Sequence, residues 1–220
     1  MDAEIPSQIE KLLKLMEKLR APGGCPWDQQ QTHFSIAKDL LEESSELIEA
    51  IETENDEAMI EELGDVLLQI VFHSHLAKER GAFEFNDVVC SISEKLIRRH
   101  PHVFNHSNIE GIDVLYEQWE RIKKEEKSGT KMERHSALDG TPLKLPALMK
   151  AQKIFKKALK ADLVEKNEIP ENSTTFEQLG EQLFQIAALA EQNGWDAETA
   201  LRKAARKREL LYREREKSNP

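Results

Sequence analysis

The chain has 220 residues, of which 41 are acidic and 31 are Lys or Arg, so its formal net charge is −10. This balance argues against broad electrostatic binding to nucleic acid or to an anionic membrane, while local basic patches remain compatible with it. No stretch approaches the roughly 18 consecutive apolar residues of a membrane-spanning helix. Cys25 and Cys90 lie far apart, and the N-terminus is amphipathic and acidic, unlike a signal peptide. We therefore expect a reduced, cytoplasmic protein.

Apolar residues recur at helical spacing through the first part of the chain. A first amphipathic helix is predicted to end before Pro22-Gly23-Gly24, and residues 21–32 are predicted to form a loop. Beyond that loop we expect helices over 33–52, 56–80 and 84–99, then one that carries Leu115, Trp119 and Ile122.

The composition changes at residues 128–144, which are rich in Gly, Thr, Ser and Pro and are predicted to form a linker. No segment alternates as a strand would, so the predicted fold class is all-α. Further helices are expected at 145–160, 174–193 and 196–217. The predicted organisation is a helical domain over 1–127, the linker, and a second helical region over 145–220.

An internal repeat is predicted from the alignment of residues 62–70 with residues 178–186, at an offset of 116. In the second copy Gln178 stands at the position of Glu62, and leucines replace two arginines of the first copy. Acidic and basic groups are lost together, which is what the loss of one shared activity would leave behind. The second copy is therefore interpreted as degenerate.

Two acidic couplets flank a predicted hairpin turn at residues 53–55. Reflection through the middle of this turn places Glu43 level with Asp65, and Glu46 level with Glu62. Within each helix the pair is spaced i, i+3, so both members point to one face. Four converging carboxylates repel one another unless a cation lies between them, and such hard oxygen ligands suit Mg²⁺ or Mn²⁺. The sequence therefore predicts a metal site.

The alternative is a solvated acidic face, since single i, i+3 pairs of acidic residues are common on exposed helices. Glu43, however, lies on the apolar stripe of Leu40 and Leu47, and Glu62 also lies on an apolar stripe. A buried carboxylate without a partner is costly, so a metal or a cationic ligand is the favoured compensation.

Lys95, Arg98 and Arg99 are spaced i, i+3, i+4, so three cations share one side of a helix. This cluster is predicted to bind a polyphosphate, with forked hydrogen bonds from Arg and a point charge from Lys. The alternative is a solvated helix end, where cations are favourable in any case.

Trp27 lies in a loop rich in Pro and Gly, where a large aromatic ring has no helix to pack. It is predicted to stack on a nucleobase, with His33, Asp28 or Gln31 supplying contacts to the base edge. The alternative is a tryptophan that seals the loop onto the helical bundle.

Several motifs occur in a fixed order: Gly24-Cys25-Pro26-Trp27-Asp28, Gln31-Thr32-His33, E-E-x-x-E at 42–46, E-x-x-D at 62–65, and Lys95-x-x-Arg98-Arg99-His100-Pro101. Together they resemble the MazG family of nucleoside triphosphate pyrophosphohydrolases, over nearly the whole chain. The resemblance implies an all-α helical-bundle MazG-like domain followed by a shortened, degenerate second MazG-like repeat. Longer family members carry a complete acidic set in the second domain, and this chain departs from that pattern.

The resemblance implies that Glu43, Glu46, Glu62 and Asp65 bind Mg²⁺, and that Glu42 beside Glu43 orients or activates water. Family members cleave (d)NTP to (d)NMP and pyrophosphate, which implies a house-cleaning role in the nucleotide pool. They pair helical hairpins across a homodimer, so a homodimer is expected.

Two other readings remain open from the sequence. The chain could hydrolyse another pyrophosphate compound, such as a nucleotide alarmone. It could also be a non-catalytic regulatory or interaction protein that keeps the helical bundle, with the degenerate second repeat as its docking surface. The intact acidic set in the first half argues against that last reading.

Overall fold

The computed structural model describes residues 4–105, 111–130, 133–169 and 174–218, and all regular structure among them is helical. The predicted all-α fold class is confirmed. The chain divides into two compact units, residues 1–110 and 111–220. None of the described helices is long and apolar enough to cross a membrane.

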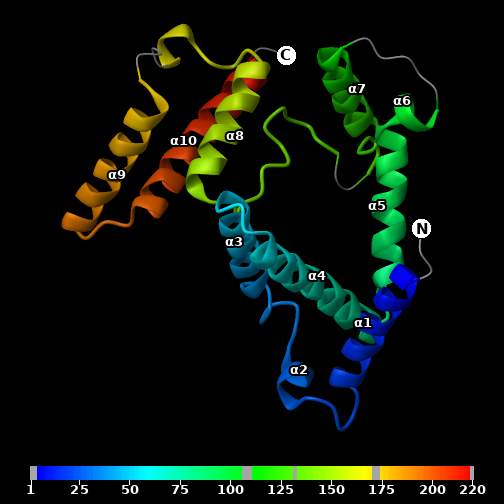
Figure 1. Cartoon of the computed structure of the whole chain (residues 1–220). Helices are drawn as coiled ribbons and strands as arrows, with labels where there is room; N and C mark the ends of the chain where they lie inside the picture. The colour runs from blue at the N-terminus through cyan, green and yellow to red at the C-terminus, as the bar shows by residue number, and fades with distance from the viewer. Residues whose placement is uncertain (1–3, 106–110, 131–132, 170–173, 219–220) are drawn as a thin grey trace. The chain divides into compact units, whose positions relative to one another are not determined.

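The first unit contains four predicted helices and two short ones that were not predicted (Figure 1). Their bounds are α1 Glu4–Arg20, α2 Pro26–Gln30, α3 Asp39–Glu52, α4 Asp56–Glu79, α5 Phe85–Arg99 and α6 Pro101–Phe104. The short helices α2 and α6 both begin with proline, which is favoured in a first helical turn, and both are too short for apolar periodicity to reveal.

Helix α3 begins at residue 39 and not at residue 33, as the periodicity had indicated. Residues 33–38 form separate turns, in which the amide of Ile36 bonds the carbonyl of Thr32 at 3.3 Å. Ile36 is nevertheless 1% exposed, so its apolar side chain serves the core from a turn.

A three-residue turn reverses the chain between α3 and α4, which lie side by side in Figure 1. Glu54 adopts a left-handed conformation with φ of 52°, and the Asn55 amide bonds the Ala50 carbonyl at 3.0 Å. The Asn55 side chain then accepts a hydrogen bond from the Ala58 amide at 3.2 Å and caps α4. The turn therefore fixes where α3 ends and where α4 begins.

The core of the first unit lies where α1 and the turn before α3 meet the second half of α4. Its buried members are Met16, Ile36, Val71, Phe72 and Leu76, and Phe85 of α5 packs against them. This core leaves the first half of α4 facing α3 alone, and that half carries the acidic residues.

Arg20 at the end of α1 ties three segments together. Its guanidinium forms two hydrogen bonds of 2.7 Å to the carboxylate of Glu79 at the end of α4. It also lies over the Phe72 ring, 5.4 Å from the centroid, and donates to the carbonyls of Asp28 and Gln31. The Arg20 side chain is 7% exposed and that of Glu79 is 40% exposed, so this forked ion pair is buried on the arginine side and open to solvent on the other.

The close turn after α1 depends on glycine. A Cβ atom at Gly24 would lie 2.2 Å from the carbonyl oxygen of Leu19, so any larger residue would push the loop away from the helix end. This turn brings residues 26–31 back toward Arg20, which places Trp27 on the surface of the first unit.

The second unit contains all four helices predicted for this part of the chain. They are α7 Ile112–Glu125, α8 Ala147–Lys160, α9 Phe176–Gln192 and α10 Ala197–Ser218, with a 3₁₀ turn at Lys166–Glu168. The segment predicted as a linker and α7 both fall in this unit. The assignment of residues 1–127 to a catalytic domain remains a prediction.

Helix α8 packs along α10, and their contact forms the core of the second unit (Figure 1). The buried members are Leu138, Ile154, Ala158, Leu163, Ala205 and Tyr212. Helix α9 packs on α10, and α4, its predicted counterpart in the repeat, packs on α5 and more extensively on α3. These contacts do not test the degenerate repeat, which remains a prediction from sequence.

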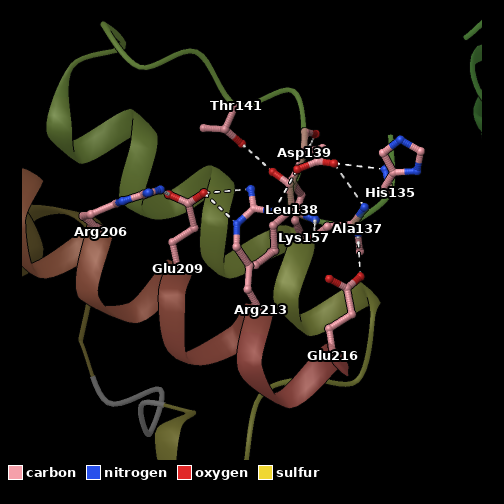
Figure 2. Close-up of polar contacts among 11 residues, drawn as sticks. His135, Ala137, Leu138, Asp139, Thr141, Lys157, Arg206, Glu209, Arg213 and Glu216 are labelled. Atoms are coloured by element: carbon pink, nitrogen blue, oxygen red, sulfur yellow. Dashed lines mark hydrogen bonds and ion pairs between the residues drawn. The ribbon is translucent and has the colours of Figure 1, made fainter. Parts of the chain in front are cut away.

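A chain of ion pairs and hydrogen bonds fastens the segment before α8 to α10 (Figure 2). Asp139 accepts a hydrogen bond of 2.8 Å from Arg213, and Arg213 bonds Glu209 at 2.9 Å. Arg206 bonds the other oxygen of Glu209 at 3.1 Å. Glu209 is 5% exposed, and these two arginines satisfy its buried charge.

We expect Ile154→Ala to lower the free energy of unfolding of the second unit by about 2–4 kcal/mol, because it leaves a cavity in the α8–α10 core. Urea denaturation followed by circular dichroism measures this loss. The matched control is Leu159→Ala on the same helix, whose side chain is 48% exposed and should cost much less. Equal losses in the two variants would contradict this description of the core.

Candidate metal centre

Three carboxylates from α3 and α4 converge in the first unit. Glu43, Glu62 and Asp65 each offer one oxygen, and these oxygens all lie within 4.8 Å of one another. All three residues are partly buried. The geometry thus brings together three of the four carboxylates that the hairpin arithmetic paired.

Glu46 is exposed and stands outside this group of three, although its charge acts on the group. The pKa of Glu43 is raised above its usual value by partial burial first, and then by repulsion from Asp65, Glu46, Glu62 and Glu42. The pKa of Glu62 is raised by partial burial, and then by Glu46, Glu61 and Asp65. The acidic residues therefore form one mutually repelling cluster.

This donor set fits a hard divalent cation. Carboxylate oxygens suit Mg²⁺ or Mn²⁺, and Mg²⁺ in proteins is usually held by a few carboxylates together with oxygens of water or substrate. A cation at this point would offset the repulsion that raises the pKa values of Glu43 and Glu62. The cluster could hold a metal ion on the chemistry of its donors.

The basic cluster of Lys95, Arg98 and Arg99 lies on the last turns of α5, while α5 packs on α4 near Phe85. At the rise of an α-helix, Lys95 stands about 15 Å further along the axis than Phe85. No residue of α5 is among the charges that shift the pKa of Glu43 or Glu62. Within one chain, the charges of the basic cluster are thus not among those that act on these two glutamates.

Trp27 lies in α2 with 59% of its surface exposed, so it does not seal the loop onto the bundle. His33 instead packs against α4, where its ring stacks on His73 with centroids 5.1 Å apart and planes at 7°. Their Nδ1 atoms are 2.8 Å apart, which requires one to donate and the other to accept. The two predicted base-binding residues therefore differ in setting, one exposed and one partly buried.

Sequence reasoning missed His73 and Gln69, which extend the acidic face along α4. Residues 62, 65, 69 and 73 follow spacings of three and four, which was the available signal. The pKa of His73 is lowered by burial and then by His33. The buried Nε2 of His33 and Oε1 of Gln69 have no hydrogen-bond partner among the described residues.

Known proteins are similar to the segment that carries the acidic and basic clusters. A family model described as the MazG nucleotide pyrophosphohydrolase domain matches residues 31–104, which contain the acidic and basic clusters. The chain is 45% identical over 215 residues to the nucleoside triphosphate pyrophosphohydrolase/pyrophosphatase MazG of Thermotoga maritima. The aligned region covers 90% of this chain and 82% of that protein.

The chain is also 42% identical over 233 residues to the nucleoside triphosphate pyrophosphohydrolase of Escherichia coli K12. This alignment covers 96% of this chain and 88% of that protein. A solved structure of a MazG-related protein from Thermotoga maritima matches with a TM-score of 0.45 and 25% identity, over 52% of this chain and 98% of that one. The identity to the two named enzymes, over most of their length, shows the family. The chain belongs to the MazG family.

Metal binding at the carboxylate cluster is expected to weaken as the pH falls. Protons compete with the cation for Glu43 and Glu62, and their raised pKa values bring this competition to a higher pH than for ordinary glutamates. Below those pKa values, we expect the affinity for Mn²⁺ to fall by up to about tenfold per pH unit for each proton displaced.

Titration of the protein with Mn²⁺ between pH 7.5 and about pH 4, which spans the range where carboxylates titrate, followed by electron paramagnetic resonance, measures this dependence. Glu62→Gln removes one titrating ligand, so its affinity should be lower at pH 7.5 and should change less with pH. An affinity that is independent of pH in the unaltered protein would contradict the proposed ligands.

Proposed function

We propose that this protein is a Mg²⁺-dependent nucleoside triphosphate pyrophosphohydrolase that converts (d)NTP to (d)NMP and pyrophosphate. The observation that carries the proposal is the carboxylate group of Glu43, Glu62 and Asp65 within the segment that the MazG family model matches. Relatives named for this activity, at 42–45% identity over most of their length, support it. We further propose a cytoplasmic, house-cleaning role, with which two unpaired cysteines are compatible.

In the proposed site Glu43, Glu46, Glu62 and Asp65 hold the cation, and Glu42 orients or activates the attacking water. When bound, Mg²⁺ would neutralise the triphosphate and lower the pKa of a bound water. Glu46 is exposed, so in this proposal it reaches the cation from the rim of the cluster. Catalysis then depends mainly on positioning and on electrostatic stabilisation.

The remaining roles fall to residues further from the cluster. Lys95, Arg98 and Arg99 are proposed to stabilise charge that develops on the phosphates. Trp27 is proposed to stack on the base, for which its exposed ring is available, and His33 to contact the base edge.

We propose that the protein acts as a homodimer. Large apolar side chains are exposed along the hairpin and α5, among them Leu41 at 66%, Ile60 at 74% and Leu96 at 49%. Such surfaces are typical of an interface between subunits. Because the basic cluster is not among the charges that act on Glu43 and Glu62 within one chain, a partner subunit is the proposed source of the cations for each site.

Hydrolysis is tested with a panel of NTPs, dNTPs and nucleotide alarmones in the presence of Mg²⁺, with the products identified by chromatography. We expect pyrophosphate and the matching monophosphate from the triphosphates. Release of pyrophosphate from alarmones alone would overturn the proposed substrate class. Absence of turnover on every compound would favour the regulatory reading.

We expect Glu62→Gln to lower kcat by at least about a hundredfold, because it removes a charged ligand from the cation without changing the size of the side chain. The helical content, measured by circular dichroism, should stay the same. Glu49→Gln is the matched control, since it makes the same change at an exposed position of α3. Full activity of Glu62→Gln would refute the assignment of the metal ligands.

Subunit complementation tests whether the site is shared across the dimer. Glu62→Gln lacks a metal ligand and Lys95→Gln lacks a phosphate contact, so each is expected to be nearly inactive alone. If each site combines carboxylates of one subunit with cations of the other, a mixed dimer contains one intact site. Random mixing in equal amounts should then restore about a quarter of the unaltered activity.

The mixture has to be unfolded and refolded together, so that subunits exchange, and compared with each variant refolded alone. If both sets of residues act within one subunit, the mixture recovers nothing. That result would contradict the shared site and leave the proposed reaction intact.

A further inference from the structure

The second unit contains a pocket with a volume of about 690 Å³, which is within the range of small-molecule sites. Its walls are the second half of α7, residues 133–137 and the end of α8. Residues from all three segments lie in the same compact unit, so the pocket does not depend on how the two units are placed.

The pocket is strongly basic although the chain as a whole carries a net charge of −10. Seven of its fourteen lining residues are Lys or Arg, and two are Glu. Lys123 is already paired with Glu120 at 2.8 Å. Arg121 is paired with Glu125 at 4.0 Å, and the charges of Lys160 and Arg134 act on the Glu120 carboxylate. Cations still outnumber the carboxylates of the lining, so the pocket carries an excess of positive charge.

Lys157 of α8 is one of the lining residues. Its ammonium group donates a hydrogen bond to the carbonyl of Asp139, which fixes its position (Figure 2). The pKa of Lys157 is lowered by burial first, and then by the neighbouring charges of Arg134 and Lys153. An anion in the pocket would offset this crowding of like charges.

The wall opposite α7 is held in place by contacts to α10 (Figure 2). The Asp139 carboxylate accepts hydrogen bonds from the amides of His135 and Ser136, at 3.0 and 3.1 Å, and from Arg213. The amide of Ala137 donates to Glu216 at 2.6 Å. A wall fastened at both ends costs little further ordering when a ligand binds.

We infer that this pocket binds a condensed phosphate, namely the di- or triphosphate group of a nucleotide or a free polyphosphate. Several cations surround one cavity, and Ser128 and Ser136 add hydroxyl groups to its lining. Such a lining suits a ligand with several charged oxygens in a row better than a ligand with one carboxylate. The lining residues of this pocket are not among those proposed for the catalytic centre, and the inference does not rest on the proposed function.

Lysine footprinting tests the inference at the pocket itself. Glu62→Gln is titrated with tripolyphosphate in EDTA, which removes metal-dependent binding and turnover, and is then exposed to reductive methylation. Mass spectrometry should show that tripolyphosphate protects Lys124 and Lys160, whereas Lys156 and Lys203, which are exposed in the same unit outside the pocket, stay reactive. Equal protection at all four lysines, or none at Lys124 and Lys160, would overturn the inference.

A matched pair of double variants gives a second measurement. Arg134→Gln/Lys160→Gln removes two charges from the pocket, and Lys156→Gln/Lys203→Gln removes two from elsewhere on the same unit. By calorimetry, we expect the first to raise the Kd for tripolyphosphate about tenfold and the second less than about twofold. Similar changes in both would show an unspecific effect of net charge and contradict the pocket.

Other ligands in the same assay distinguish the source of the phosphate. A nucleoside triphosphate that binds more tightly than tripolyphosphate identifies a nucleotide, and equal affinities identify the phosphate chain alone. Both results support the site. Equal binding of sulfate at the same ionic strength, or of a nucleoside without phosphate, would overturn the inference. None of these outcomes depends on whether the protein hydrolyses triphosphates.

Discussion

The register of α3 against α4 governs everything else in the first unit. It is set by three residues, with Glu54 in a left-handed conformation and Asn55 capping the next helix. Because each residue turns a helix by about 100°, one residue more or less in this turn would rotate the acidic side chains of one helix away from those of the other. The carboxylate cluster is therefore a consequence of turn geometry as much as of composition.

The cluster costs the isolated chain stability, since the charges that shift Glu43 and Glu62 are all negative. Interactions elsewhere in the first unit offset this loss of stability. The apolar core and the forked pair of Arg20 with Glu79 hold the other half of α4. A mutually repelling, charged site next to a well-packed scaffold is the usual division between function and stability.

The helices and the convergence of carboxylates could be predicted because both depend on local spacing. Long helices repeat their apolar pattern several times, and a short turn makes the pairing of two helices a matter of counting. The ion pair of Arg20 and Glu79, and the stacking of His33 on His73, join residues 59 and 40 positions apart. Nothing in the spacing of these residues encodes such contacts, because they arise only when the helices pack.

The basic pocket of the second unit is another feature that the spacing of residues in the sequence does not predict. The missing acidic residues, such as Gln178 in place of Glu62, suggested a half that had only lost groups. In the structure, Lys and Arg side chains from α7, from α8 and from the segment between them line one pocket. The spacing of residues within a single helix cannot predict such a pocket. Charge in this chain is thus distributed by unit, with an anionic cluster suited to a cation in one and a cationic pocket suited to phosphate in the other. A triphosphate complexed with a metal ion carries both kinds of charge, so one class of ligand satisfies the chemistry of both sites.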